Sequence, residues 1–308
     1  MSTFYYVYGP VPSRRMGLSL GISPIPKGHC NYSCIYCQLG RTKKMVNQQI
    51  AFFELSSIIG EFKKYLIKDI DFDVITIVGE GEPLLYLGIG NLIRELKKFT
   101  DKPIAIITNG ALLSIPSIRD DLLEADIVLP SLDAVDKSTF KTINRPHGDI
   151  SFDNMVEGLI DFSKDFKGQL WIETMIIKGI NDNKNFYLRL KDILKKINYE
   201  RLYLNVPVRP PAESFVLPPS NESLNEAISI LGGISIDKLV SEGFYSEIED
   251  DYKAILSIIK RHPMNQFELK TFLEKRNNKD IDNFLKRLSA DKNIEVIDYK
   301  NYMTYRLK

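Results

Sequence analysis

Three cysteines within eight residues are the most chemically distinctive feature of this 308-residue sequence. Cys30, Cys34 and Cys37 are also the only cysteines in the chain. Their spacing, with three and then two intervening residues, allows one tight loop to turn all three sulfurs toward a common centre. No disulfide scheme uses all three. We therefore predict that these thiols are metal ligands.

The number of thiols bears on the choice of metal. A structural zinc site takes four protein ligands, and the nearest histidine, His29, directly precedes Cys30, so its side chain is expected to point away from the target of that sulfur. A four-iron cluster held by three cysteines leaves one iron open for a substrate or cofactor. The ligand count favours the iron–sulfur cluster, with zinc as the alternative.

The cysteine spacing, with Tyr36 before the last cysteine, resembles the signature of the radical S-adenosylmethionine (radical SAM) enzymes. The resemblance implies that Cys30, Cys34 and Cys37 hold a [4Fe-4S] cluster whose open iron binds the amino and carboxylate groups of SAM, with Tyr36 near the adenine. It also implies a flavodoxin- or ferredoxin-type electron donor, reductive cleavage of SAM and abstraction of a substrate hydrogen. Residues 9–15, Gly-Pro-Val-Pro-Ser-Arg-Arg, resemble the opening of a subgroup placed with nitrogenase-cofactor maturases and wyosine synthases.

A second segment of this kind follows a predicted buried strand at 74–78. It reads Gly-Glu-Gly-Glu-Pro, residues 79–83. Glycines let the backbone approach a ligand closely, and carboxylates accept hydrogen bonds from an ammonium group. Radical SAM enzymes commonly have Gly-Gly-Glu-Pro here and use it to contact the amino group of SAM. Because the second position departs from that pattern, the choice between the two carboxylates stays open. The implied SAM contacts are Gly79, Glu80, Gly81 and Glu82.

Polar residues also follow the next two predicted strands, at 103–107 and 127–129. They are Asn109, Ser131 and Asp133. The carboxyl ends of neighbouring parallel strands converge on one mouth of a barrel. The resemblance implies that these residues line the SAM site, with Ser131 toward the ribose. The alternative is that each caps the helix that follows it.

Four further charged side chains are candidates without an assigned role. Arg14 and Arg15 are candidates for binding an anionic substrate or the SAM carboxylate, or else they are solvated or paired internally. Arg209 lies in a Pro-rich stretch at 205–220 and has the same two interpretations. Glu173 either lines the barrel interior or pairs with a basic neighbour. The sequence assigns no catalytic residue.

The elements that position these residues alternate between strand and helix. Pro10 and Pro12 are expected to interrupt the first strand-like stretch. Six strand-and-helix units match the partial (β/α)6 TIM-like barrel of the radical SAM core. We predict strands at 17–22, 74–78, 103–107, 127–129, 169–177 and 202–206, and helices at 53–68, 89–99, 116–123, within 136–165, at 186–197 and at 221–231.

The composition changes near residue 252. Residues 252–308 contain 13 Lys and Arg against 7 Asp and Glu. Their pattern predicts three helices followed by a hairpin, the order of a winged helix. Its basic residues Lys279, Lys286 and Arg287 would contact nucleic acid, or the unit would dock a protein or substrate. The predicted units are a core barrel at 1–205, a Pro-rich crossing and helical connector at 206–250, and the winged-helix-like unit at 251–308.

Global properties narrow the functional classes. A formal charge of +1 gives no overall attraction to nucleic acid or to an anionic membrane. The sequence lacks an apolar run of roughly twenty residues, the length that crosses a bilayer, so we expect a cytoplasmic protein. The leading interpretation is a radical SAM enzyme of the oxidoreductase type. Its substrate is unknown, and RNA and protein are among the candidates. The alternatives are an RNA- or tRNA-modifying radical SAM enzyme and an iron–sulfur redox sensor that binds DNA.

Overall fold

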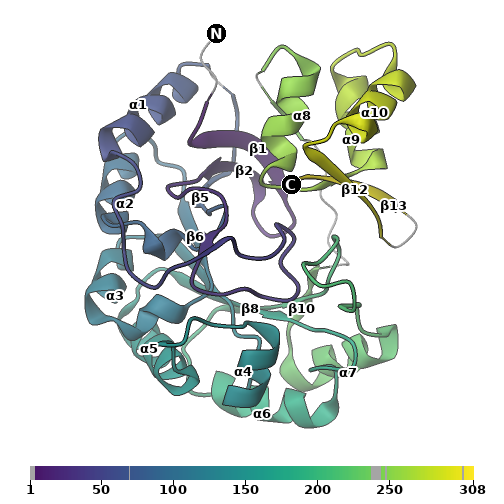
Figure 1. Ribbon diagram of the computed structural model, residues 1–308. Coiled ribbons are helices and arrows are strands. Elements are labelled where there is room, and N and C mark those ends of the chain that lie inside the picture. Colours follow the sequence, from purple (N-terminus) through teal and green to yellow (C-terminus); the bar gives the residue numbers. More distant parts are fainter. Residues whose placement is uncertain (1–3, 69, 237–243, 247, 300–301) are drawn as a thin grey trace.

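An eight-stranded, mostly parallel sheet forms the centre of the molecule. The computed structural model describes residues 4–68, 70–236, 244–246, 248–299 and 302–308 (Figure 1). The edge strand β1 is antiparallel to β2, and the remaining neighbours are parallel. The spatial order is β1 (Val7–Ser13), β2 (Gly17–Ile22), β5 (Val74–Ile77), β6 (Ile104–Thr108), β7 (Ile127–Pro130), β8 (Gln169–Met175), β9 (Arg201–Asn205) and β10 (Ile234–Ser235).

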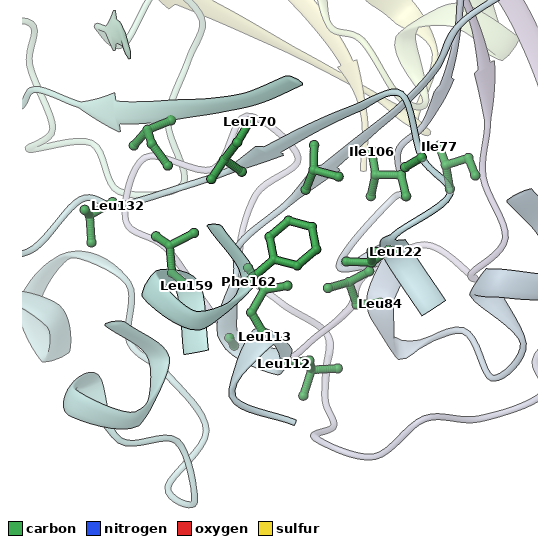
Figure 2. Close-up of a cluster of buried hydrophobic side chains, with 14 of the residues drawn as sticks. Ile77, Leu84, Ile106, Leu112, Leu113, Leu122, Leu132, Leu159, Phe162 and Leu170 are labelled. Atoms are coloured by element: carbon green, nitrogen blue, oxygen red, sulfur yellow. The ribbon is translucent and has the colours of Figure 1, made fainter. Parts of the chain in front are cut away.

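Helices follow the parallel strands and lie in an arc outside the sheet (Figure 1). Apolar residues at helical spacing bury one face of each long helix against the strands. Figure 2 shows part of this layer, where Ile77, Ile106 and Leu170 of the strands face Leu122 and Phe162 of the helices. The helices are α1 (Leu55–Leu66), α2 (Ile89–Lys97), α3 (Pro116–Leu122), α4 (Lys137–Ile143), α5 (Phe152–Asp165), α6 (Lys184–Leu194) and α7 (Asn221–Leu231).

The predicted α/β alternation is confirmed, whereas the predicted interruption at the N-terminal prolines is wrong. β1 runs through Pro10 and Pro12 and pairs with β2, with an irregularity in register between Tyr8 and Val11. Proline has no N–H for a ladder hydrogen bond, but an edge strand or a bulge tolerates that loss. The prolines therefore lie on the edge strand, where no further strand requires a backbone donor at these positions.

The face of the sheet opposite the helices has an apolar floor. Because side chains alternate along a strand, residues two apart share this face. Trp171 of β8 and Tyr203 of β9 lie on it, with ring centroids 5.7 Å apart, and the guanidinium of Arg201 lies 4.5 Å from the centre of the Trp171 ring. Val74 and Ile127 also belong to this small buried cluster.

The C-terminal elements have a hydrophobic cluster of their own. Its centre includes Ile255, Phe272 and Leu288, one from each of three helices. The three predicted helices and the paired strands are present, and a short additional strand joins them; the residues 300–301 lie outside the described chain. The elements are α8 (Asp251–Ile259), β11 (Met264–Asn265), α9 (Gln266–Lys275), α10 (Ile281–Ala290), β12 (Ile294–Tyr299) and β13 (Tyr302–Leu307), with antiparallel strand order β11-β13-β12.

The C-terminal unit contacts the sheet beside β1 (Figure 1). Arg261, just after α8, donates a 2.7 Å hydrogen bond to the carbonyl of Tyr5 and stacks over the ring of Tyr8. Tyr299 of β12 donates to the carbonyl of Pro207 in the Pro-rich crossing. Within the described ranges, no helix has both the length and the apolar character needed to span a bilayer.

Candidate active site

The cysteine loop follows β2 and is held on both sides by backbone hydrogen bonds. Cys30 belongs to the short strand β3 (His29–Cys30), which pairs with β4 (Lys44–Met45). The N–H of Ile35 donates to the carbonyl of Ile143, at the end of α4, and the N–H of Cys37 donates to the carbonyl of Cys34. The β3–β4 pair thus fixes the start of the loop, and α4 fixes its middle.

All three thiols are free and only partly exposed. Burial raises the pKa of each thiol, to about 12 for Cys30. Metal ligation requires the thiolate, so binding releases protons from these groups. Among the described residues, no three His, Cys, Asp or Glu side chains gather closely enough to ligate one metal ion. A four-iron cluster does not require that approach, since each thiolate binds an iron of its own.

Two asparagine amides donate hydrogen bonds to the cysteine sulfurs. Nδ2 of Asn109, a predicted SAM contact, lies 3.7 Å from Sγ of Cys30, and Nδ2 of Asn144 lies 3.6 Å from Sγ of Cys34. Asn144 follows α4 and carried no sequence signal, because its role depends on where that helix packs. Hydrogen bonds to sulfur ligands are one of the means by which a protein sets the potential of an iron–sulfur cluster.

Glu82 is buried and hydrogen-bonded within the barrel. Its carboxylate accepts from the hydroxyl of Thr108 at 2.6 Å, the N–H of Asn109 at 2.7 Å and the N–H of Leu84 at 3.0 Å. Burial raises its pKa to about 7, although these hydrogen bonds oppose the shift. The charge of Glu82 also contributes to the raised pKa of Cys30, which places this carboxylate on the cysteine side of the site.

Glu80 has a different environment, two residues earlier. Its carboxylate pairs with two cations of the C-terminal unit, with Nζ of Lys260 at 3.3 Å and Nε of Arg261 at 3.5 Å. Between the two acids, a Cβ on Gly81 would collide with the backbone of His29. The close approach of Gly81 to the His29 backbone therefore requires glycine. The partners of Glu80 lie far away in the chain, so no local sequence pattern identifies them.

Asp133 connects the cysteine loop to the strand ends. It accepts hydrogen bonds from the hydroxyl of Tyr36 at 2.5 Å, the amide of Asn144 at 2.7 Å and the N–H of Met175 at 2.9 Å. Burial raises its pKa. Ser131 lies at the end of β7 and forms an isolated parallel bridge with β8. The structure therefore brings Tyr36 and Asp133 together beside Cys34.

A cavity of about 350 Å³ opens between the cysteine loop, the sheet and the C-terminal unit. Its volume lies within the roughly 300–1,000 Å³ typical of small-molecule sites. Tyr36 and Cys37 form part of its lining, as does Tyr8 of β1. Seven further polar lining residues come from four segments: Arg14, Arg15, Glu173, Asn205, Arg209, Arg261 and His262.

Glu173 lines this cavity and also pairs with a basic residue. The two alternatives predicted for it, lining the interior and pairing with a basic neighbour, are therefore both present. Its carboxylate forms an ion pair with Arg15 and accepts a 3.0 Å hydrogen bond from the amide of Asn205. Burial lowers the pKa of Arg15 to about 10, which leaves the guanidinium charged at neutral pH. The charge of Arg15 is thus compensated inside the cavity.

The Pro-rich crossing is tied to the cysteine loop through Glu213. This buried acid accepts two hydrogen bonds from Arg41, just after the loop, and a 2.5 Å hydrogen bond from Arg145. The hydrogen bond from Arg41 is the main reason why the pKa of Glu213 is lowered. Sequence reasoning missed this acid because both of its partners are distant in the chain.

Comparisons with known proteins find similar sequences and similar folds. The sequence pattern of the Radical SAM superfamily matches residues 25–189. A UPF0026 protein of Methanocaldococcus jannaschii is 37% identical over 281 residues, which cover 88% of this chain and 86% of that protein. A radical SAM methyltransferase from Sphaerobacter thermophilus has a similar fold, with TM-score 0.56 and 16% identity over 71% of this chain and 68% of that chain. TYW1 with a bound lysine–pyruvate adduct has TM-score 0.51 and 18% identity over 70% and 74% of the two chains.

Proposed function

Because the chain belongs to the radical SAM superfamily, whose enzymes use a [4Fe-4S] cluster and SAM, we propose that Cys30, Cys34 and Cys37 are the cluster ligands. When bound by these cysteines, such a cluster would supply the electron for reductive cleavage of SAM and so the means to abstract a substrate hydrogen. The protein itself orients the reactants and excludes water. A flavodoxin- or ferredoxin-type protein is the proposed electron donor.

The observation that carries this proposal is the position of the cavity. It reaches the cysteine loop at Tyr36 and Cys37 and extends over the sheet face to the C-terminal unit. A substrate bound there lies next to the cysteine loop and is covered by protein on the opposite side. An enzyme that generates a reactive radical needs a recessed site, because water and wrong partners must be kept from the reacting groups.

We propose that SAM lies at the strand ends on the cysteine side of the cavity. The proposed contacts with SAM there are the backbone at Gly79 and Gly81, the carboxylate of Glu82 and Ser131 at the end of β7. Tyr36 and Asp133 would hold the loop in place through their mutual hydrogen bond. Asn109 adds its contact with Sγ of Cys30. We assign Glu80 to docking of the C-terminal unit, since its carboxylate is already paired with Lys260 and Arg261.

The first test is anaerobic reconstitution with iron and sulfide, followed by addition of dithionite and SAM. The expected product is 5′-deoxyadenosine, measured by chromatography, with no product from Cys34→Ala. A Cys variant that still cleaves SAM would contradict the ligand assignment. A stable four-iron cluster that neither binds nor cleaves SAM would instead favour a redox-sensing regulator, and zinc with no cluster would contradict both proposals.

We further propose three units, at 1–205, 206–250 and 251–308, with the last one a winged-helix-like module. The order α8, β11, α9, α10, β12, β13 supports this proposal. Exposed Lys279, Lys286 and Arg287 at and near α10 favour RNA modification as the second candidate function. Fluorescence anisotropy with bulk tRNA tests it. Binding that falls at least tenfold when Lys286 and Arg287 are both changed to Gln would support the RNA candidate, and unchanged binding would exclude this surface.

A further inference from the structure

The part of the cavity lining that comes from outside the cysteine loop is rich in positive charge. We call it the arginine wall and define it by Arg14, Arg209, Arg261 and His262. It is assembled from three parts of the chain: the turn after β1, the Pro-rich crossing and the segment that follows α8. Among the described lining residues the one carboxylate is Glu173, and Arg15 already neutralises it.

The positive charges of the wall are only partly compensated. Arg261 shares the carboxylate of Glu80 with Lys260, so two cations face one anion. Arg209 donates to the carbonyl of Pro263 at 2.8 Å and forms a longer ion pair, at 3.4 Å, with Glu268. Removing charges from water without full pairing is unfavourable, so an anion that entered here would relieve the imbalance.

Arg14 has the weakest compensation in the wall. Its Nη1 donates a long, 3.4 Å hydrogen bond to the carbonyl of Ile236, and within the described part of the chain no carboxylate forms an ion pair with it. Its partly buried side chain lines the cavity, and its guanidinium makes no other hydrogen bond to a described residue. A guanidinium has five N–H donors in a planar fork that matches the two oxygens of a carboxylate or the oxygens of a phosphate.

The positive charges of the wall affect the pKa of His262. Burial, followed by the charges of Arg209 and Arg14, lowers the pKa of His262 well below 6.5, so its imidazole is neutral at physiological pH. Its Nδ1 is buried and has no hydrogen-bond partner among the described residues. A neutral histidine can offer either a donor or an acceptor, and a buried polar atom without a partner in a cavity is a natural ligand contact.

We propose that the arginine wall binds an anionic group of the substrate, a carboxylate or a phosphate, with Arg14 and Arg209 as its main ligands. This inference rests on the proposed function, because it names the substrate class of the same cavity. Anchoring at the wall would point the rest of a small substrate toward Tyr36 and Cys37. Arg209 and Arg261 also contact the C-terminal unit or belong to it, so docking of that unit completes the binding site.

Isothermal titration calorimetry of the cluster-loaded protein, with and without SAM, tests the proposal. The probes are glycerol 3-phosphate, succinate and, as the neutral comparison, glycerol. We expect saturable binding of the phosphate or the dicarboxylate and none of glycerol. The two anionic probes distinguish a phosphate from a carboxylate as the preferred group. Failure of both anions to bind would overturn the proposal.

Variants locate the binding to the wall. We expect Arg14→Gln to weaken anion binding at least tenfold, and Arg14→Lys, which keeps the charge but loses the fork, to weaken it less. Arg94→Gln is the matched control, since Arg94 is an exposed arginine on α2. If Arg14→Gln and the wild-type protein bind the anionic probes with equal affinity, the proposal is overturned, even if that affinity is high.

The same samples separate this inference from the proposed function. 5′-Deoxyadenosine formation without anion binding would overturn the anion site and leave the radical SAM assignment standing. The opposite result is anion binding that depends on Arg14 in a protein that forms its cluster but does not cleave SAM. It would support the anion site and overturn the proposed radical SAM activity. Circular dichroism of each variant confirms that the fold is intact.

Discussion

The two sides of the cavity hold their charges in different ways. On the cysteine side, Glu82 and Asp133 are buried acids that accept hydrogen bonds from amides and hydroxyls of the strand ends. On the arginine wall, cations from separate segments are held by ion pairs and carbonyls across the joint with the C-terminal unit. The acids of the first group are thus held by the strand ends themselves, whereas the cations of the second group depend on contacts between two parts of the molecule.

Glu80 and Glu82 mark the boundary between these sides. Glu80 faces Lys260 and Arg261, and Glu82 faces Thr108 and Asn109. Two acids of one five-residue segment thus have different partners, cations of the C-terminal unit for Glu80 and the strand ends for Glu82. Substitutions at each of them test whether the two sides are separable.

Glu80→Ala should have the largest effect, because it leaves the cations of the joint without their carboxylate. Arg261 has a side chain only 6% exposed, and losing the partner of a buried charge costs about 3 kcal/mol. We expect a decrease of that size in the free energy of unfolding, measured by urea titration with far-ultraviolet circular dichroism. Glu95→Ala, which breaks an exposed pair with Lys98, should cost no more than about 0.5 kcal/mol. If the two substitutions lowered the free energy of unfolding equally, the role of Glu80 in holding the C-terminal unit would be contradicted.

The pH dependence of stability should identify Glu82. Its pKa is about 7 in the folded protein against an ordinary value of 4.5. Between pH 4.5 and about pH 7, the folded state therefore holds a proton on Glu82 that the unfolded state has lost. As pH rises through this range, Glu82 makes the free energy of unfolding fall. Above this range, its contribution no longer changes with pH. The decrease reaches roughly 3 kcal/mol at most.

The measurement compares metal-free wild-type protein with Glu82→Gln from pH 5 to pH 8. The glutamine amide of the variant meets N–H donors at this position, so the variant also differs in stability by an amount that does not depend on pH. The informative quantity is therefore the change of the difference with pH. We expect the wild-type protein to lose stability relative to Glu82→Gln as pH rises. A difference that stays constant with pH would show that Glu82 is not buried in this way.

The smallest expected effect concerns the sulfur hydrogen bonds on the cysteine side. Asn144→Ala removes the donor to Cys34, and Asn109→Ala removes the donor to Cys30. Each loss should make the cluster potential more negative by about 40 mV, the equivalent for one electron of a hydrogen bond of roughly 1 kcal/mol. Electron paramagnetic resonance during a redox titration measures the shift. The exposed Asn91→Ala on α2 is the control, and an unchanged potential in both test variants would contradict the prediction.

Sequence patterns predicted the barrel elements well, because their signals are local. The buried run that became β5 and the amphipathic spacing that became α2 are examples. Contacts between distant segments were not predictable in the same way. Glu80 meets cations of the C-terminal unit, and Glu213 joins Arg41 to Arg145 across the Pro-rich crossing. Which side of the cavity a charged residue serves depends on such docking, and no periodicity encodes it.

The position of Trp171 has a practical consequence. It is the chain's one tryptophan, and it is buried in the floor of the barrel beneath Arg201. Its emission will therefore follow the unfolding of the barrel and will be largely insensitive to the C-terminal unit. If that unit melts first, fluorescence and circular dichroism will give different midpoints, which is the standard sign of a transition with an intermediate. The chain thus carries a built-in optical reporter for one of its parts.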